Sequence, residues 1–209
     1  MIDGIEKYQQ YLGYRYASFK RAFDEFVLIN GKTIVELGTT RSFVSGGVRG
    51  CMVNDRKYWY PNNPARWDWG AGMFTRVCAE SLRLYAPDIH TVDISEDAIE
   101  ISKETTKEFE QFVHHHLESS EAFLSCFSGQ IDLLYMDSGE TDEQADELHL
   151  REAQIVIGKD ALSRKAIVLI DDVNIPSCSD SKGRYSIPFF RQKGYEVLMW
   201  DYQVILQRP

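Results

Sequence analysis

The sequence predicts an α/β fold in which a mainly parallel seven-stranded sheet carries helices on both faces and ends in an antiparallel hairpin. Short apolar runs, typical of strands buried on both faces, alternate along the chain with segments of helical periodicity. The last two runs, 195–200 and 203–207, are separated by only Asp201 and Tyr202 and predict the hairpin. The 209 residues are expected to form one domain, 1–209, with a sizeable core.

The order of the elements follows from periodicity and from helix start and stop signals. An N-terminal helical segment, 1–30, has aromatic and apolar residues at helical spacing and ends at Asn30-Gly31. Ser95 followed by two acids predicts a helix start, because a serine cap and first-turn acids stabilise a helix N-terminus. The predicted strands are 33–37, 89–94, 112–117, 131–136, 166–170, 195–200 and 203–207, and the helices between them are about 73–85, 95–109, 120–127, 141–157 and 187–192.

Two of the apolar runs end in a carboxylate, at Glu36 and at Asp93. In an open parallel sheet, ligands bind just outside the carboxyl ends of the strands. Gly38 follows the first acid, where the backbone must approach a ligand closely, and Asp93 can accept hydrogen bonds from two vicinal hydroxyls. These positions predict a site for a ligand that contains a ribose.

This pair of strand ends resembles the class I methyltransferases, which have a Rossmann-like fold and bind S-adenosylmethionine. The resemblance implies that Glu36 and Gly38 lie under the amino-acid end of the cofactor and that Asp93 holds its ribose. Glu118 and Ser119 take the place where the family contacts the adenine, although Ser119 or Ser120 is equally well explained as a helix cap. The cofactor-binding residues expected on this basis are Glu36, Gly38, Thr39, Asp93, Ile94, Glu118, Ser119 and Asp137.

Three further acids, Asp137, Asp171 and Asp172, follow the fourth and fifth predicted strands. Like charges so close together raise one another's pKa unless a cation neutralises them, and ligands that are all oxygen suit Mg²⁺. The arrangement resembles the metal-dependent O-methyltransferases of the catechol and macrolide-sugar types, which implies that these acids hold Mg²⁺ or Mn²⁺. The ion would bind two acceptor oxygens and lower the pKa of the one to be methylated. Alternatively, Asp171 and Asp172 only cap a loop and Asp137 only completes the cofactor edge.

The catalytic residues expected are Asp137, Asp171 and, as general base, His149 on the helix after the fourth strand. A lone helical histidine is more often a packing or surface residue. Lys182 and Arg184, in the polar loop after the fifth strand, are other polar groups that could fold over a substrate.

The segment 41–70 is an insertion between the first strand and its helix, where the family needs only a tight turn. It is rich in tryptophan and tyrosine beside glycine and proline. Long loops inside compact domains are usually functional, so we expect a lid that stacks on a flat acceptor and excludes water. An aromatic mini-core or a dimer contact would produce the same composition.

Composition limits the partners of the chain. The net charge of −9 disfavours a nucleic-acid substrate, because phosphates need clustered lysine and arginine. No apolar run is long enough to span a bilayer and the N-terminus does not resemble a signal peptide, so the cytoplasm is expected. A small hydroxylated molecule is the expected acceptor, and a homo-oligomer is possible.

We therefore predict an S-adenosylmethionine-dependent methyltransferase, with metal-assisted O-methylation as its reaction. An aminopropyltransferase of the same fold is one alternative. A non-catalytic module for cofactor binding or oligomerisation is another. A nicotinamide dehydrogenase is disfavoured because no G-x-G-x-x-G follows the first strand.

Overall fold

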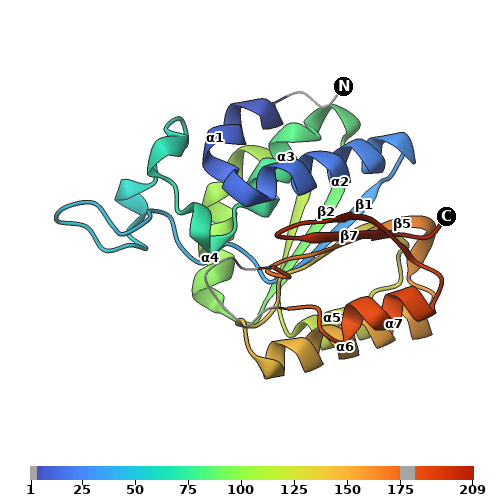
Figure 1. The fold of residues 1–209 in the computed structure, drawn as a ribbon. Coiled ribbons are helices and arrows are strands. Elements are labelled where there is room, and N and C mark those ends of the chain that lie inside the picture. The colour runs from blue at the N-terminus through green and yellow to red at the C-terminus, as the bar shows by residue number, and fades with distance from the viewer. Residues whose placement is uncertain (1–3, 175–181) are drawn as a thin grey trace.

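The computed structural model describes residues 4–174 and 182–209. Its centre is one seven-stranded sheet in the order β3-β2-β1-β4-β5-β7-β6 (Figure 1). The strands are β1 (Thr33–Leu37), β2 (Asp88–Asp93), β3 (Val113–Leu117), β4 (Ile131–Met136), β5 (Leu162–Ile170), β6 (Glu196–Trp200) and β7 (Val204–Gln207). The first five are parallel and β7 is antiparallel to both of its neighbours, so the predicted fold class is confirmed.

The α-helices are short, and none of those described is long and apolar enough to cross a membrane. They are α1 (Gln9–Leu12), α2 (Tyr16–Leu28), α3 (Phe74–Ser81), α4 (Glu96–Thr105), α5 (Ser120–Cys126), α6 (Glu143–Gly158) and α7 (Ser186–Gln192). Ser95 caps α4 by accepting a hydrogen bond from the Ala98 N–H at 3.3 Å, as its sequence predicts.

Alternate side chains of the strands feed two separate apolar cores, as the period of a strand requires. Ile34 and Leu133 point into a core shared with α1, α2 and α3, whereas Val35 and Leu134 point into a core shared with α5, α6 and α7. Figure 1 shows these two helical layers above and below the sheet. Both faces are therefore buried, which explains why the strands read as continuous apolar runs.

Three predicted boundaries differ from the structure by four residues, and most others by one or two. The helix predicted to continue to about residue 85 ends at Ser81, and Arg83–Tyr85 forms a separate 3-10 turn. β5 begins at Leu162, four residues before the predicted start, because Leu162 pairs with Ile131 ahead of a register shift in the β4–β5 ladder. The helix predicted to continue to about residue 109 ends at Thr105, and Lys107–Phe109 forms a separate 3-10 turn.

Two tryptophans of the aromatic insertion pack against the N-terminal segment. Trp67 is buried, forms an isolated antiparallel bridge to Val44 and lies 5.6 Å from the Tyr8 ring centroid. Trp69 stacks on Tyr11 with a centroid distance of 5.4 Å. These contacts form an aromatic mini-core, which is one of the alternatives to a lid that the sequence allows.

Candidate functional site

A cavity of about 560 Å³ lies at the carboxyl ends of the parallel strands. It runs from the end of β2 across the turn after β1 to the ends of β4 and β5. We call the part beside Asp93 the Asp93 end, and the part beside Asp137, Asp171 and Asp172 the acid end. The lining residues are Arg15, Gly38, Thr39, Arg41, Gly70, Ala71, Asp93, Ile94, Ser95, Ala98, Asp137, Gly139, Glu140, Thr141, Asp172, Lys182 and Tyr202.

The turn after β1 forms the floor of this cavity. Gly38 has φ of +85°, which favours glycine, and a Cβ atom there would lie 2.7 Å from the carbonyl oxygen of Asp137. Only glycine therefore lets the β1 and β4 turns approach each other so closely. The sequence predicts a close backbone approach at Gly38, and the structure shows one, to the backbone of Asp137.

At the Asp93 end, the carboxylate is oriented by two backbone N–H groups. Thr39 donates to Oδ2 at 3.0 Å and Ser95 donates to Oδ1 at 2.8 Å. Each carboxylate oxygen has two lone pairs, so each can still accept one hydroxyl hydrogen bond from a ligand. Asp93 and Ile94 both line the cavity, and they are thus placed as a ribose site would need them.

Glu36 lies beneath the cavity and does not line it. Its Oε2 atom accepts hydrogen bonds from the hydroxyls of Thr75 and Thr91. Burial raises the pKa of the Glu36 carboxyl to about 8, although the threonine hydrogen bonds oppose this shift. This acid therefore supports the turn after β1 from below.

The two residues predicted to contact adenine are also outside the cavity lining. The Glu118 N–H donates to the Asp93 carbonyl at 3.1 Å, which fixes the β3 end beside the β2 end. The Ser119 hydroxyl accepts from the Ala122 N–H at 3.2 Å and caps α5, which is the alternative role that the sequence allowed.

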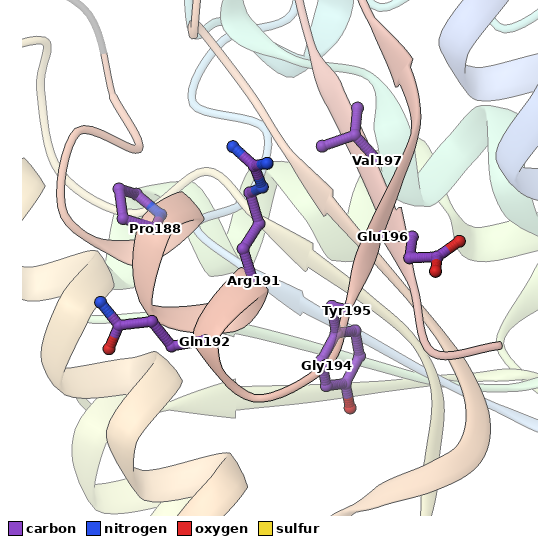
Figure 2. A pocket seen from close by; sticks show the side chains of 7 residues that line it. All are labelled: Pro188, Arg191, Gln192, Gly194, Tyr195, Glu196 and Val197. Atoms are coloured by element: carbon purple, nitrogen blue, oxygen red, sulfur yellow. The ribbon is translucent and has the colours of Figure 1, made fainter.

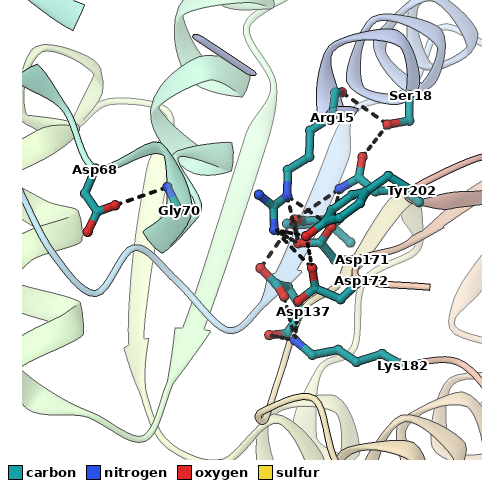
Figure 3. A network of polar contacts seen from close by, with 11 residues as sticks. Arg15, Ser18, Asp68, Gly70, Asp137, Asp171, Asp172, Lys182 and Tyr202 are labelled. Atoms are coloured by element: carbon teal, nitrogen blue, oxygen red, sulfur yellow. Dashed lines mark hydrogen bonds and ion pairs between the residues drawn. The ribbon is translucent and has the colours of Figure 1, made fainter. Parts of the chain in front are cut away.

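At the acid end, one oxygen from each of Asp137, Asp171 and Asp172 lies within 4.8 Å of the others. Two basic side chains hold them together (Figure 3). Arg15 donates from Nη2 to Asp171 at 2.8 Å and to Asp172 at 3.2 Å, and Lys182 donates from Nζ to Asp137 Oδ1 at 2.7 Å. The structure places the three acids together, as the sequence predicts. The sequence does not indicate that Arg15 pairs with them.

Asp171 is completely buried and has no free oxygen. Besides Arg15, it accepts hydrogen bonds from the Tyr135 hydroxyl at 2.9 Å and from the Gln203 amide at 2.7 Å. Burial by itself would raise the pKa of Asp171, but the Arg15 guanidinium holds it below its usual range. Burial and the charge of Asp171 together raise the pKa of Asp137 to about 7.

The three acids have the ligand type and the spacing that a divalent ion needs. Their existing pairs with Arg15 and Lys182, however, leave no room for an ion. A Mg²⁺ ion needs oxygens at about 2.0–2.1 Å and usually keeps several waters. Arg15 occupies both oxygens of Asp171, and Lys182 lies 2.7 Å from Asp137 and 3.6 Å from Asp172. An ion at this point would meet two positive charges and a carboxylate that is closed to water.

His149 does not lie at the cavity. It is completely buried on α6, where its Nε2 atom is 3.0 Å from the Ser138 carbonyl, and burial lowers its pKa to about 3. The Ser138 hydroxyl also donates to Glu152 at 2.6 Å. The structure thus places His149 behind the turn after β4, as a packing residue and away from the cavity.

Sequence reasoning missed Arg15, Tyr202 and Gln203. The Tyr202 hydroxyl donates to Asp172, and its ring lies under the Arg15 guanidinium at 4.9 Å. One signal was present: Arg15 is the single basic residue among the apolar and aromatic positions 11–16. A charge in such a stretch is expected to be paired when the segment is buried.

A second hollow, of about 780 Å³, lies between α7 and β6 at the other edge of the sheet (Figure 2). Arg191 and Glu196 are the charged residues that line it, and it is remote from the strand ends that hold the acids. It lacks the clustered carboxylates and the close backbone turn of the first cavity. The smaller cavity is therefore the candidate active site.

Comparison with known proteins agrees with this geometry. A family model described as a methyltransferase domain matches residues 69–173, half of the chain. The chain belongs to the methyltransferase domain family. Its class I fold and its dependence on S-adenosylmethionine follow from this membership and confirm the resemblance found in the sequence. A search of curated proteins gave no significant match.

Several solved methyltransferases share the fold at low sequence identity. A Podospora anserina methyltransferase with bound S-adenosylhomocysteine has a TM-score of 0.62 at 14% identity, and the match covers 100% of this chain and 88% of that one. The N-methyltransferase NodS from Bradyrhizobium japonicum scores 0.55 at 9% identity, with 94% and 97% covered. A candidate O-methyltransferase from Klebsiella pneumoniae scores 0.55 at 13% identity, with 92% and 80% covered. At these identities the matches show the shared fold and no acceptor type.

Proposed function

We propose that this methyltransferase transfers the methyl group of S-adenosylmethionine to a hydroxyl oxygen of a small polar acceptor. The cofactor would lie over Gly38 with its ribose at Asp93, and the acceptor would lie at the acid end. The observation that carries the proposal is the pair of charges lining that end, the Asp137 carboxylate and the Lys182 ammonium.

A hydroxyl group suits this pair because it both donates and accepts hydrogen bonds. It can donate to Asp137 while its oxygen accepts from Lys182. An amine acceptor, including the substrate of an aminopropyltransferase, is protonated near neutral pH and then only donates hydrogen bonds, so it offers no lone pair to the Lys182 ammonium. This difference favours an oxygen acceptor over an amine.

The reaction is a single displacement at the methyl carbon. The acceptor oxygen forms a bond to that carbon as the carbon–sulfur bond breaks, and the bonding pair stays on sulfur to give S-adenosylhomocysteine. The hydroxyl proton passes to the Asp137 carboxylate and then to solvent. Lys182 stabilises the negative charge that develops on the oxygen, and Arg15 orients the acids from behind.

A divalent ion held by Asp137, Asp171 and Asp172 is the second candidate for the cation that stabilises the negative charge on the acceptor oxygen. The 4.8 Å spacing of the three acids favours it. The Arg15 and Lys182 pairs oppose it, because each occupies oxygens that the ion would need. We therefore propose methyl transfer that does not depend on Mg²⁺ or Mn²⁺.

The expected partners are small molecules. Arg15, Arg41 and Lys182 in the cavity are accompanied by Asp93, Asp137, Glu140 and Asp172, so the lining is of mixed sign and does not form a basic track for a nucleic acid. An acceptor with several hydroxyl groups would satisfy both signs of charge. A homo-oligomer is compatible with this proposal but is not needed for it.

The test is methyl transfer from labelled S-adenosylmethionine to a panel of hydroxylated and amino compounds. We expect products from hydroxylated compounds only, and Asp137→Asn should lower turnover by about 10²-fold or more, as expected for loss of a general base. Glu147→Gln, an exposed change on α6, is the matched control. Transfer to amines alone, or aminopropyl transfer from the decarboxylated cofactor, would contradict the proposal. Cofactor binding with no turnover across the panel would indicate a non-catalytic module.

A further inference from the structure

The two basic side chains at the acid end come from segments far apart in the sequence. Arg15 ends a 3-10 turn, Gly13–Arg15, before α2 and reaches Asp171 across 156 residues of sequence. Lys182 begins the described segment before α7 and reaches Asp137 across 45 residues. Neither pair is a local surface contact, since the side chain of Lys182 is 3% exposed and that of Arg15 is 15% exposed.

Lys182 lies among the oxygens that would otherwise surround an ion. Its Nζ atom is 2.7 Å from Asp137 Oδ1, 3.1 Å from the Asp137 carbonyl and 3.6 Å from Asp172 Oδ2. These are oxygens of the kind that Mg²⁺ and Mn²⁺ prefer. Figure 3 shows the ammonium on the far side of Asp137 and Asp172 from the Arg15 guanidinium.

Arg15 closes the other side of the cluster. Its Nε atom is 3.1 Å from Asp171 Oδ1 and its Nη2 atom is 2.8 Å from Oδ2, a bidentate arrangement that is among the strongest for a carboxylate. The formal charge of three carboxylates and two cations is −1. An added divalent ion would reverse that sign, whereas three unpaired acids would carry −3 and attract one strongly.

We propose that Lys182 is the resident cation of the acid end and that it takes the place of a divalent metal ion. The role of the ammonium toward the acceptor oxygen rests on the function proposed above, whereas its exclusion of metal does not. The inference predicts that the wild-type chain binds Mn²⁺ weakly and that removal of the ammonium creates a metal site from Asp137 and Asp172.

The experiment is a titration of the whole chain with Mn²⁺ alone, read by the electron paramagnetic resonance signal of the free ion. We expect Lys182→Met, which keeps most of the side-chain volume, to bind one Mn²⁺ at least tenfold more tightly than wild type. Asp172→Asn in the same chain should abolish the gain. Lys20→Met is the matched control, because Lys20 also pairs with a carboxylate, at 2.8 Å, but on the surface.

Two results of the Mn²⁺ titration would overturn the inference. Tight Mn²⁺ binding by wild type that Asp137→Asn removes would overturn the inference, and so would a folded Lys182→Met chain with no gain in affinity. If Lys182→Met does not fold, Lys182→Gln is titrated in its place, and the wild-type measurement alone can still refute metal exclusion. Because the titration contains neither cofactor nor acceptor, its result is independent of whether methyl transfer to hydroxyl groups is found.

Discussion

The Asp93 end and the acid end of the cavity both present carboxylates at the carboxyl ends of strands, but they hold them differently. Asp93 is held by backbone N–H groups of Thr39 and Ser95, in turns that the strand order already places beside it. The acids of the other end are held by Arg15 and Lys182. Backbone donors leave a carboxylate charged and open to a ligand. Side-chain cations neutralise it and close it to a second cation.

The largest effect that would test this comparison is expected from Arg15→Met. It leaves Asp171 buried without its counter-charge, and breaking a buried pair in this way costs about 3–5 kcal/mol of the free energy of unfolding. Lys20→Met on α2 is the control, because its pair with Asp24 lies at the surface, and it should change stability by about 0.5 kcal/mol or less. Urea denaturation measures both variants.

The double variant Arg15→Met with Asp171→Asn sharpens the result. Neutralising the acid removes the unpaired charge, so we expect the double variant to be more stable than Arg15→Met alone. A loss of about 1 kcal/mol or less in Arg15→Met, with no recovery in the double variant, would mean that Arg15 does not hold the acid end together.

The next effect concerns the Asp93 end and the cofactor. Asp93→Asn removes one charged acceptor while its shape is kept, and hydrogen bonds to charged groups contribute about 1.5–3 kcal/mol. Affinity for S-adenosylhomocysteine should therefore fall about ten- to a hundredfold, as measured by calorimetry. Asp97→Asn, on the exposed first turn of α4, should leave the affinity unchanged. Equal affinities of the Asp93→Asn variant and wild type would exclude Asp93 as the ribose ligand.

The same contrast explains what the sequence could predict. The buried runs and the turns after β1 and β2 are local patterns, so Gly38 and Asp93 could be placed from the residues alone. The ends of β4 and β5 could also be brought together, because parallel strands end at one edge. The metal prediction came from these acids alone, since three clustered carboxylates require a cation.

The identity of that cation depends on tertiary packing that no short pattern contains. Arg15 lies on the N-terminal segment, which reaches the acids from 156 residues away and also packs on the aromatic insertion, where Trp69 stacks on Tyr11. His149 is a similar case. The sequence predicts that it lies on a helix, but it does not predict that the side chain is buried behind Ser138. Spacing alone cannot distinguish a paired acid from a free one.

Glu36 is a third kind of carboxylate, held by side-chain hydroxyls. Its replacement is expected to have the smallest effect on stability among these predictions. Its described partners are threonine hydroxyls and not cations, and burial raises its pKa to about 8 from an ordinary value of 4.5. Between these values the folded chain keeps a proton that the unfolded chain releases, so this group makes the fold less stable as pH rises. The slope it contributes is at most about 1.4 kcal/mol per pH unit.

Glu36→Gln removes this titration while it keeps the hydrogen bonds to Thr75 and Thr91 possible. We expect the free energy of unfolding, measured in urea at pH 5.5, 6.5 and 7.5, to fall less steeply with pH than in wild type, with the largest gain over wild type at pH 7.5. Glu147→Gln on the exposed face of α6 should leave the slope unchanged. Parallel slopes for Glu36→Gln and wild type would mean that Glu36 is ionised in the fold. The backbone and hydroxyl donors around the β1 end would then stabilise a buried charge without a cation, and the two ends of the cavity would differ less than we infer.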